Sequence, residues 1–586
     1  MRPSRTIPFG LAVLLLAAAC LTPLLAEDPR HPGIFKDYGA SPSASLRFFA
    51  SEAGRDALLH SPNPTAIELL RHFHPDAVGQ YPLQPLMQPA PMGVARPAVS
   101  VTGCGTDSGT VMNRESATNA VAQRQPSVDF LLSELGSGKD LVVEHGDDSR
   151  YVTGVLDSYN AIYVHRDGSV PCYGGTDFEM GNPPIADPFN NGNFLTGTGE
   201  ARVIADPAAS RKQFIFADMR FNGTTSGIGL RRISAAHFES TGTCPAGTLS
   251  FGQEATCAGT TAILVNASLD NEADAPSIAQ DPRSSGTGAG DIYIVATSFR
   301  YLRSVITLTA CKATFTTAAD CSDPIVVSGS QNDAQFGSVA VVGGGSNAGK
   351  IVLSYVDSGA IEFVSCTPAG APSHPTCGSR STVRNDGLVY SYLTDNGYAT
   401  VDVWPAIAAR TDGSGQTIFV VWSECKVAYA QGLVGCPDAD IVMSVDTSLS
   451  SPSWAFHHVS TSSGHQIMPS IAYDSGQNVI NIGYYSSKSD LYKNKYVMLM
   501  NQIAGGGITV GSTITLTTSY DSIGGDGSAY GFGTPPFGSF LGMAARGGTG
   551  SGSSRVYVGF TSNARLGTYG TITNTQSDNN IVRATY

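Results

Sequence analysis

The chain has 586 residues and a formal net charge of −13, and only 14% of its residues are charged. Phosphate binding needs clustered Lys and Arg, and the sequence contains no such cluster, so we expect no nucleic-acid partner. The 66 glycines and the low charge are typical of many short strands joined by turns, which favours an all-β protein over a helical one.

Residues 1–26 have the pattern of a secretory signal peptide. Arg2 and Arg5 precede a short apolar run from Phe9 to Leu21, and we expect cleavage after Ala26. The run ending at Cys20 also resembles a lipoprotein box in part, so a lipid anchor at Cys20 is the alternative. No later segment is apolar enough to cross a membrane. The sequence therefore predicts a secreted, periplasmic or cell-surface protein.

The cysteines support export. Apart from Cys20 there are ten, and eight of them fall in close pairs with separations of 13, 10, 11 and 11 positions. The ten are Cys104, Cys172, Cys244, Cys257, Cys311, Cys321, Cys366, Cys377, Cys425 and Cys436. An even number of cysteines in an exported chain predicts disulfides, with Cys104 and Cys172 left as a long-range pair. Zinc sites use C-x₂₋₄-C spacing, which is absent.

The first part of the mature chain differs from the rest. Residues 27–81 contain two segments with helix-like periodicity, Ser45–His60 and Thr65–His74, which predict a small helical N-terminal region. Residues 82–119 begin with a proline-rich stretch and are predicted to form an extended linker with a lead-in strand.

A repeated pair of short strands begins at about residue 120 and determines the expected fold. The first strand of a pair carries Ser or Ala beside an aliphatic residue, and a turn rich in Gly, Asp or Ser follows it. The first strands are Pro126–Phe130, Glu200–Ile204, Pro276–Ala279, Gly337–Ala340, Pro405–Ala408, Pro469–Ala472 and Leu541–Ala544. The second strands, strongly β-prone, are Leu141–His145, Phe214–Asp218, Ile292–Ala296, Ile351–Tyr355, Ile418–Trp422, Ile480–Tyr484 and Val556–Phe560.

Seven such pairs occur at intervals of roughly 60 to 75 residues, which leaves room for two further strands in each interval. A repeated four-stranded antiparallel sheet is a propeller blade. Neighbouring blades bury each other's faces, and closing the ring removes the exposed end faces. The sequence therefore predicts a seven-bladed β-propeller over residues 120–586. A row of β-sandwich domains is the alternative, which would need about 100 residues per repeat.

Parts of this repeat resemble the sialidase-like propellers with BNR repeats of exported bacterial proteins. The phrases that carry the resemblance are Pro276–Asp281, Ile418–Ser423 and Pro469–Asp474. The resemblance covers roughly residues 120–586, and the segment from Phe540 to Arg583 is similar to the family's closing blade. Similar sialidases have six blades, so six is the alternative blade number.

The family's Asp-box, S-x-D-x-G-x-x-W, is present only in degenerate form, as Ser444-Val-Asp446 with Trp454 and as Arg166–Ser169. In three blades a cysteine pair stands near the position of the box. These pairs are Cys244/Cys257, Cys311/Cys321 and Cys366/Cys377. We expect these disulfides to replace the Asp-box as clamps on the turn, each stabilising the fold by about 2–3 kcal/mol.

The polar residues just after the second strands are the candidate site. In a propeller the start of each first strand and the end of each second strand lie on the same rim, so these residues are expected to ring one mouth of the central channel. They are Asp147, Asp148, Asp218, Arg220, Arg300, Asp357, Glu424, Tyr485, Lys488 and Arg565.

The resemblance implies roles for some of these residues by blade position alone. Similar sialidases hold an acidic sugar with three arginines and use a tyrosine nucleophile paired with a glutamate. Arg220, Arg300 and Arg565 would bind the carboxylate. Asp148 and Asp357 are further ligand-binding candidates. Tyr485, Glu424 and Asp218 are the catalytic candidates. The alternative is that these residues are solvated charges or ion pairs between blades.

No G-x-S-x-G elbow, H-E-x-x-H motif or P-loop accompanies the fold motifs. We therefore expect a non-catalytic module that binds an extracellular glycan, peptide or protein at the channel mouth. An exo-sialidase-like glycoside hydrolase is the alternative, and a purely structural surface protein is a third. Asp438 and Asp440 are candidate calcium ligands, but no full oxygen-donor loop surrounds them, so we expect no metal or other cofactor.

Overall fold

The described part of the chain in the computed structural model lies within residues 100–586. The described residues are 100–102, 110–111, 121–132, 140–152, 155–166, 178–181, 185–189, 194–221, 225–236, 261–269, 271–300, 303–329, 333–385, 392–393, 399–400, 403–412, 415–426, 436, 438–460, 462, 464–488, 495–504, 507–517, 521–522, 541–547, 554–569 and 572–586. The predicted signal peptide (1–26) and helical region (27–81) lie outside them.

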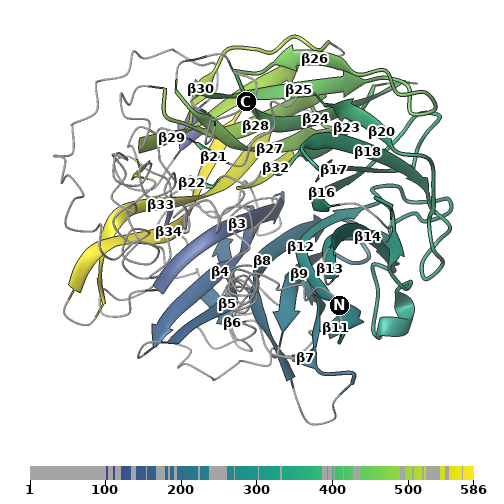
Figure 1. The fold of residues 1–586 in the computed structure, drawn as a ribbon, viewed down its shortest axis with the longest axis horizontal. Coiled ribbons are helices and arrows are strands. Elements are labelled where there is room, and N and C mark those ends of the chain that lie inside the picture. The colour runs from purple at the N-terminus through teal and green to yellow at the C-terminus, as the bar shows by residue number, and fades with distance from the viewer. Residues whose placement is uncertain are drawn as a thin grey trace, which may run out of the picture.

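The described residues form an all-β propeller, with sheets arranged around a central axis (Figure 1). Seven of the described sheets hold four or five strands each, and we name them sheets I to VII. Sheet I contains β3 (Val121–Leu131), β4 (Leu141–Val152), β5 (Val155–Arg166) and β6 (Phe178–Gly181). Sheet II contains β7 (Ile185–Ala186), β8 (Phe194–Asp206), β9 (Gln213–Phe221), β10 (Ser226–Ser234) and β11 (Thr261–Ser268). Sheet III contains β12 (Glu272–Gln280), β13 (Ile292–Arg300), β14 (Arg303–Cys311) and β15 (Ile325–Val326).

Sheet IV contains β16 (Ala334–Val341), β17 (Ile351–Asp357), β18 (Ala360–Thr367), β19 (Thr376–Cys377) and β20 (Ser381–Arg384). Sheet V contains β23 (Ala406–Asp412), β24 (Gly415–Cys425), β25 (Ala439–Asp446) and β26 (Ala455–His458). Sheet VI contains β27 (Gln466–Asp474), β28 (Val479–Ser486), β29 (Lys495–Ala504), β30 (Ile514–Thr515) and β31 (Asp521–Ser522). Sheet VII contains β32 (Gly542–Arg546), β33 (Arg555–Tyr569), β34 (Ile572–Thr585), β1 (Ser100–Thr102) and β2 (Thr110–Val111). The short strands β21 (Tyr392–Leu393) and β22 (Ala399–Thr400) pair with each other.

Every predicted strand pair is present, and each is antiparallel: β3–β4, β8–β9, β12–β13, β16–β17, β23–β24, β27–β28 and β32–β33. The first member of each pair is the inner strand of its sheet. Each inner strand contacts the inner strand of the next sheet in the order β3, β8, β12, β16, β23, β27, β32, and β32 contacts β3 again. This closed order contradicts the alternative of separate sandwich domains.

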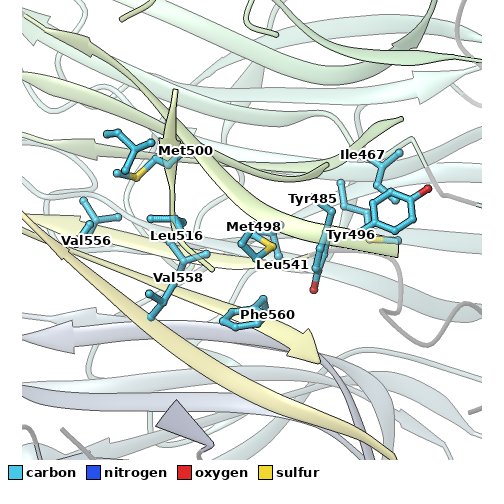
Figure 2. Close-up of a cluster of buried hydrophobic side chains, with 14 of the residues drawn as sticks. Ile467, Tyr485, Tyr496, Met498, Met500, Leu516, Leu541, Val556, Val558 and Phe560 are labelled. Carbon is cyan, nitrogen blue, oxygen red and sulfur yellow. The ribbon is translucent and has the colours of Figure 1, made fainter. Parts of the chain in front are cut away.

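Apolar side chains fill the spaces between adjacent sheets, which is what stacked blades require. One such cluster joins sheets VI and VII and includes Met498, Val558 and Phe560, all at most 1% exposed (Figure 2). A second joins sheets III and IV around Tyr293 and Tyr355. The second strands are buried on both faces, and this explains why the sequence shows them as almost continuous apolar runs.

A β-bulge interrupts most inner strands just before the Ser or Ala position of the repeat. The register shifts before Ser127, Arg202, Ser277, Ser338 and Ser470. Next to these bulges, Glu200, Ala275, Phe336 and Met468 have φ values between 51° and 58°. Bulges of this kind bend the strand and change the direction of the following side chain.

Two of the repeated serines join neighbouring inner strands. Ser127 Oγ on sheet I accepts a hydrogen bond of 3.0 Å from the backbone N–H of Val203 on sheet II. Ser277 Oγ on sheet III accepts an equivalent bond of 3.3 Å from Val339 on sheet IV. Inner strands of different blades share no β-ladder, so these hydroxyls satisfy backbone donors that no strand partner reaches.

The N-terminal strands complete the last sheet. β1 pairs with β34, with Ser100 opposite Thr585, and β2 pairs with the same strand, with Thr110 opposite Ile581. Strands from both ends of the described chain therefore belong to sheet VII. An ion pair of 2.9 Å between Arg546 on β32 and Asp129 on β3 adds a contact across the closure between sheets VII and I.

Candidate functional site

A cavity of about 190 Å³ lies on the axis of the propeller and is lined by residues of all seven inner strands and their lead-in residues. Two successive repeat positions supply most of its wall. The first position forms a layer that we call the channel layer: Ser127, Arg202, Ser277, Ser338, Ala406, Ser470 and Gly542. The second forms an aliphatic layer: Val128, Val203, Ile278, Val339, Ile407, Ile471 and Met543.

Arg202 is the one charged member of the channel layer. Its Nε donates a hydrogen bond of 2.9 Å to the carbonyl of Pro276 on sheet III. Its guanidinium carbon lies 4.4 Å from the ring centroid of Trp404, which leads into the inner strand of sheet V. These two contacts show that Arg202 reaches from sheet II across the axis. A small residue in its place could contact neither group.

Trp404 lies at the end of the channel where the inner strands begin, which we call the channel mouth. It is 5% exposed, lines the cavity, and packs against Phe336 with ring centroids 5.4 Å apart. Arg202, Phe336 and Trp404 together form what we call the channel floor, which is the group of stacked side chains on the mouth side of the channel layer. A guanidinium on an aromatic face is a favourable contact, and it keeps both groups in a fixed position.

Sequence reasoning missed the channel floor. The signal was present, because aligning the seven repeats places Arg202 where the others carry Ser, Ala or Gly. The same alignment places Trp404 two positions before this layer in sheet V. Predicting their contact was impossible without the fold, since the two residues are far apart in the sequence and meet only across the axis.

Two predicted mouth residues, Asp218 and Arg220, form a buried ion pair. Both lie on β9, their side chains are at most 3% exposed, and the closest nitrogen–oxygen distance is 2.7 Å. The opposite strand provides space through glycine: a Cβ on Gly229 would lie 2.5 Å from Asp218 Oδ1 and 2.7 Å from Arg220 Nε. The pair lies within one sheet, so Asp218 and Arg220 are neither solvated charges nor an ion pair between blades, the two alternatives that we predicted.

His145 on β4 packs beside this ion pair. Its ring meets Phe216 edge-on, and its Nδ1 lies 3.0 Å from the carbonyl oxygen of Arg202. Burial lowers the pKa of His145 to about 4, against an opposing effect from the charge of Asp218. The charges of Arg220 and Arg231 lower it further. The imidazole is therefore neutral near pH 7.

Glu424, a second catalytic candidate, joins sheets IV and V. It is 4% exposed, forms an ion pair of 3.1 Å with Arg384 of β20, and accepts a hydrogen bond of 3.0 Å from Trp422 Nε1. Arg384 also lies 3.9 Å above the ring of Phe456. These contacts give Glu424 a clear role in holding the two sheets together.

Tyr485, the predicted nucleophile, joins sheets VI and VII. It is 1% exposed, and its hydroxyl accepts a hydrogen bond of 2.8 Å from Thr561 N and donates one of 3.2 Å to Thr561 O. Tyr485, Glu424 and Asp218 lie on different sheets, and the contacts described tie each to its own or the adjacent sheet.

Of the remaining predicted residues, Asp357 ends β17 and forms an ion pair of 2.7 Å with Arg380. The backbone N–H of Lys488 donates to Ser486 Oγ. The strands place the backbones of Asp147, Asp148, Arg300 and Arg565 at the mouth-side hairpins of sheets I, III and VII, while their side chains lie outside the described part. Whether three arginines face one ligand therefore stays a prediction.

A tyrosine–glutamate pair that the sequence analysis did not select lies near Asp357. Tyr355 on β17 is directly opposite Glu362 on β18. Burial raises the pKa of Glu362, and burial together with the charge of Glu362 raises the pKa of Tyr355. Thr382 donates a hydrogen bond of 2.9 Å to Glu362. Tyr355 is fully buried, so the pair sits behind the mouth surface.

Three of the predicted disulfides are confirmed: Cys311–Cys321, Cys366–Cys377 and Cys425–Cys436. The first two close the loop after the third strand of their sheets, at the face opposite the channel mouth. The third closes the loop after β24, on the mouth side. The predicted cysteines 104, 172, 244 and 257 lie outside the described residues.

The degenerate Asp-box segment of sheet V also clamps a turn. Asp446 accepts hydrogen bonds from the backbone N–H groups of Ser448 and Ser453, at 3.0 and 2.8 Å. Trp454 packs edge-on against Phe363 of sheet IV, with ring centroids 5.0 Å apart. This turn occupies the position that disulfides occupy in sheets III and IV.

The candidate calcium ligands Asp438 and Asp440 contact a lysine. Lys426 Nζ lies 3.2 Å from Asp438 and 3.0 Å from Asp440. In the part of the chain that the structure describes, no group of three or more His, Cys, Asp or Glu side chains is arranged to hold a metal ion. No helix among the described residues has the length and hydropathy needed to span a membrane.

No protein-family model matches the chain, and the search of curated proteins found no match. Among solved structures, the neighbours include sialidases and other glycoside hydrolases with propeller folds, at low similarity. The Hadza microbial sialidase Hz136 is 10% identical with a TM-score of 0.34, over 72% of this chain and 73% of that one. A leech intramolecular trans-sialidase is 12% identical with a TM-score of 0.34, over 82% and 70%. The intramolecular trans-sialidase from Ruminococcus gnavus is 11% identical with a TM-score of 0.31, over 79% and 95%.

Proposed function

We propose that the protein is an exported, non-catalytic binding module that recognises an extracellular glycan, peptide or protein at the channel mouth. The observation that carries this proposal is Arg202, which replaces the small residue of the channel layer and stacks on Trp404. A charged group in a layer of small residues has a cost in desolvation that packing alone does not explain. The three disulfides are consistent with export.

We also infer that each of sheets I to VII is one blade, which makes seven. The support is the closed contact order of the inner strands and the one residue that each contributes to the channel layer.

The chemistry of the floor suits a small polar group of a larger ligand. Arg202 offers guanidinium N–H donors, Trp404 offers an aromatic surface, and the serines of the channel layer offer hydroxyls. Binding sites commonly combine an apolar wall with a few such polar groups that fix the orientation of the ligand.

Arg202→Ser tests the proposal, because it introduces the residue that four of the other sheets carry at this position. The purified mature protein is applied to a printed glycan array and a random-peptide array, and the best probe is then titrated against the variants. We expect Arg202→Ser to weaken binding at least about tenfold, which is about 1.4 kcal/mol. Ser453→Ala, in the turn after the third strand of sheet V and outside the channel lining, is the control and should bind like wild type. Equal binding by Arg202→Ser and wild type would contradict the proposal.

Hydrolysis of a glycan is the second candidate, and the carboxyl of Glu362 favours it. A carboxyl whose pKa is raised by burial suits a general acid. The test is turnover of a fluorogenic sialoside panel by wild type and Glu362→Gln. Hydrolysis by wild type that Glu362→Gln abolishes would replace the binding proposal, whereas no turnover above background removes this candidate.

A further inference from the structure

The hairpins between the second and third strands differ in length around the mouth. In sheet VII, Gly559 is opposite the channel-layer residue Gly542, and β33 continues to Tyr569 while paired with β34. In sheet I, His145 is opposite Ser127, and β4 continues to Val152 while paired with β5. At about 3.3 Å per residue, these extensions reach about 33 Å and about 23 Å beyond the channel layer.

In the part of the chain that the structure describes, the second strands of the other sheets have shorter extensions on the same side. In sheet IV, Ser354 is opposite Ser338 and β17 ends at Asp357. In sheet VI, Gly483 is opposite Ser470 and β28 ends at Ser486. The five other extensions reach about 10–17 Å by the same measure. Among the described strands, the mouth is therefore bordered unequally, and the two long ribbons are adjacent.

The two long ribbons belong to adjacent sheets. β3 contacts both β33 and β34, and Figure 1 shows the yellow ribbon of sheet VII beside the blue ribbon of sheet I. We call the extended described parts, residues 146–152, 155–161, 560–569 and 572–580, the mouth ribbons. The channel cavity of about 190 Å³ is smaller than the roughly 300–1,000 Å³ of a usual ligand pocket. Most of a ligand bound at this mouth must therefore lie outside the channel, where these ribbons extend farthest among the described strands.

The composition of the mouth ribbons indicates the class of ligand. Segment 561–580 of sheet VII is dominated by amide and hydroxyl residues and contains one Arg and one Asp, which gives no net charge. Segment 146–161 of sheet I contains three Asp, one Arg and two Tyr. Amides and hydroxyls both donate and accept hydrogen bonds, as sugar hydroxyls do. The ribbons and the chain net charge of −13 both disfavour a polyanion.

From this asymmetry we infer that the mouth ribbons bind a linear, neutral glycan chain of several sugar units whose end reaches the channel floor. The inference rests on the proposed function and narrows its ligand class. The ribbons add contacts along the glycan, so affinity increases with the number of sugar units. Acidic glycans bind more weakly than neutral ones, because the ribbon of sheet I is acidic.

The experiment compares wild type with a shortened ribbon in which residues 566–575 are replaced by Asn-Gly, so that Arg565 and Gln576 stay paired. The probes are printed linear neutral and acidic oligosaccharides of one to six units. We expect wild type to bind neutral hexamers at least about tenfold more tightly than dimers, and the shortened variant to lose this difference while binding dimers equally.

A pair of milder variants guards against misfolding of the shortened ribbon. Asn574→Ala/Gln576→Ala and Thr573→Ala/Thr575→Ala change the two faces of β34, since residues two apart share a face. One of these variants should lower hexamer affinity at least about fivefold without changing the melting temperature.

Two kinds of result would overturn the inference. Unchanged length dependence in all ribbon variants would remove the ribbons from the site, while loss of binding in Arg202→Ser would leave the proposed function standing. Tighter binding of acidic glycans or of peptides, or no binding to any printed glycan, would reject the neutral glycan. The proposed function itself fails if Arg202→Ser binds its best probe as wild type does, or if the peptide array is also empty.

Discussion

Single residues of the channel layer show two uses of one repeat position. Ser127 and Ser277 accept a backbone hydrogen bond from the next sheet, so their hydroxyls join inner strands that share no ladder. Arg202 has no hydroxyl for such a bond. It instead donates a hydrogen bond to Pro276 on sheet III and stacks on Trp404 across the axis. A position that joins inner strands in sheets I and III and carries an arginine in sheet II is where function can be added without loss of the ring.

Ser277→Ala should lower the free energy of unfolding by about 1–2 kcal/mol, because it leaves the N–H of Val339 without its side-chain acceptor. Urea unfolding followed by intrinsic fluorescence measures the change. Ser338→Ala is the matched control, since its hydroxyl forms no hydrogen bond to another described residue; it should cost less. Equal losses for the two variants would show that the inter-sheet bond contributes nothing of its own.

His145 should make the free energy of unfolding depend on pH. Its pKa is about 4 in the folded protein, lowered by burial, and about 6.5 when unfolded, so the unfolded chain binds the proton first as the pH falls. Stability is therefore intact above about pH 6.5 and decreases towards pH 4, by about 3 kcal/mol in total.

Denaturant unfolding at several pH values between 7.5 and 4.5 tests this dependence. His145→Gln should be less stable at pH 7.5 because the packing against Phe216 is lost, and its curve should be flatter in this range. Parallel curves for wild type and variant would mean that His145 is not the responsible group.

At the scale of elements, the loops after the third strands are clamped in different ways in different sheets. Cys311–Cys321 and Cys366–Cys377 close these loops in sheets III and IV, and Asp446 closes the equivalent turn in sheet V. The loops face away from the channel mouth, so the clamps stabilise the propeller without shaping the candidate site.

Removing one of these disulfides should therefore lower the free energy of unfolding without changing ligand affinity. Cys311→Ser/Cys321→Ser opens a loop with a sequence separation of 10 and should lower the free energy of unfolding by about 2–3 kcal/mol. Calorimetry measures the loss, and binding of the best array probe should stay unchanged below the melting temperature. A loss of binding in the folded variant would place this loop in the site, against our assignment.

Most strands could be predicted from the sequence, whereas the contacts between sheets could not. Strands such as β17 and β28 were predictable because an apolar run between turns describes a strand buried on both faces. The close cysteine pairs were predictable because short loops limit their partners. The roles of the mouth residues were not: Glu424 meets Arg384 from the neighbouring sheet, and Tyr485 meets Thr561. Such contacts depend on how sheets face each other, which no local pattern encodes.

For the whole molecule, stability depends on closing the ring. Sheet VII takes its outer strands from residues 100–111 and its inner strands from residues 542–585. Arg546 ties this sheet to Asp129 of sheet I and to the carbonyl of Ala205 in sheet II. Closure of this kind buries the end faces of the stacked sheets, which an open row would expose to solvent.

Deleting residues 1–111 should expose the edge of β34, since β1 and β2 both pair with that strand. Each lost backbone hydrogen bond contributes about 0.5–1.5 kcal/mol, so we expect a loss of at least about 2 kcal/mol. The exposed edge should also promote self-association that increases with concentration, measured by light scattering after size-exclusion chromatography. Deletion of residues 1–98 is the control, because it keeps both strands. If the two truncated proteins are equally stable and equally monomeric, the N-terminal strands do not close the ring.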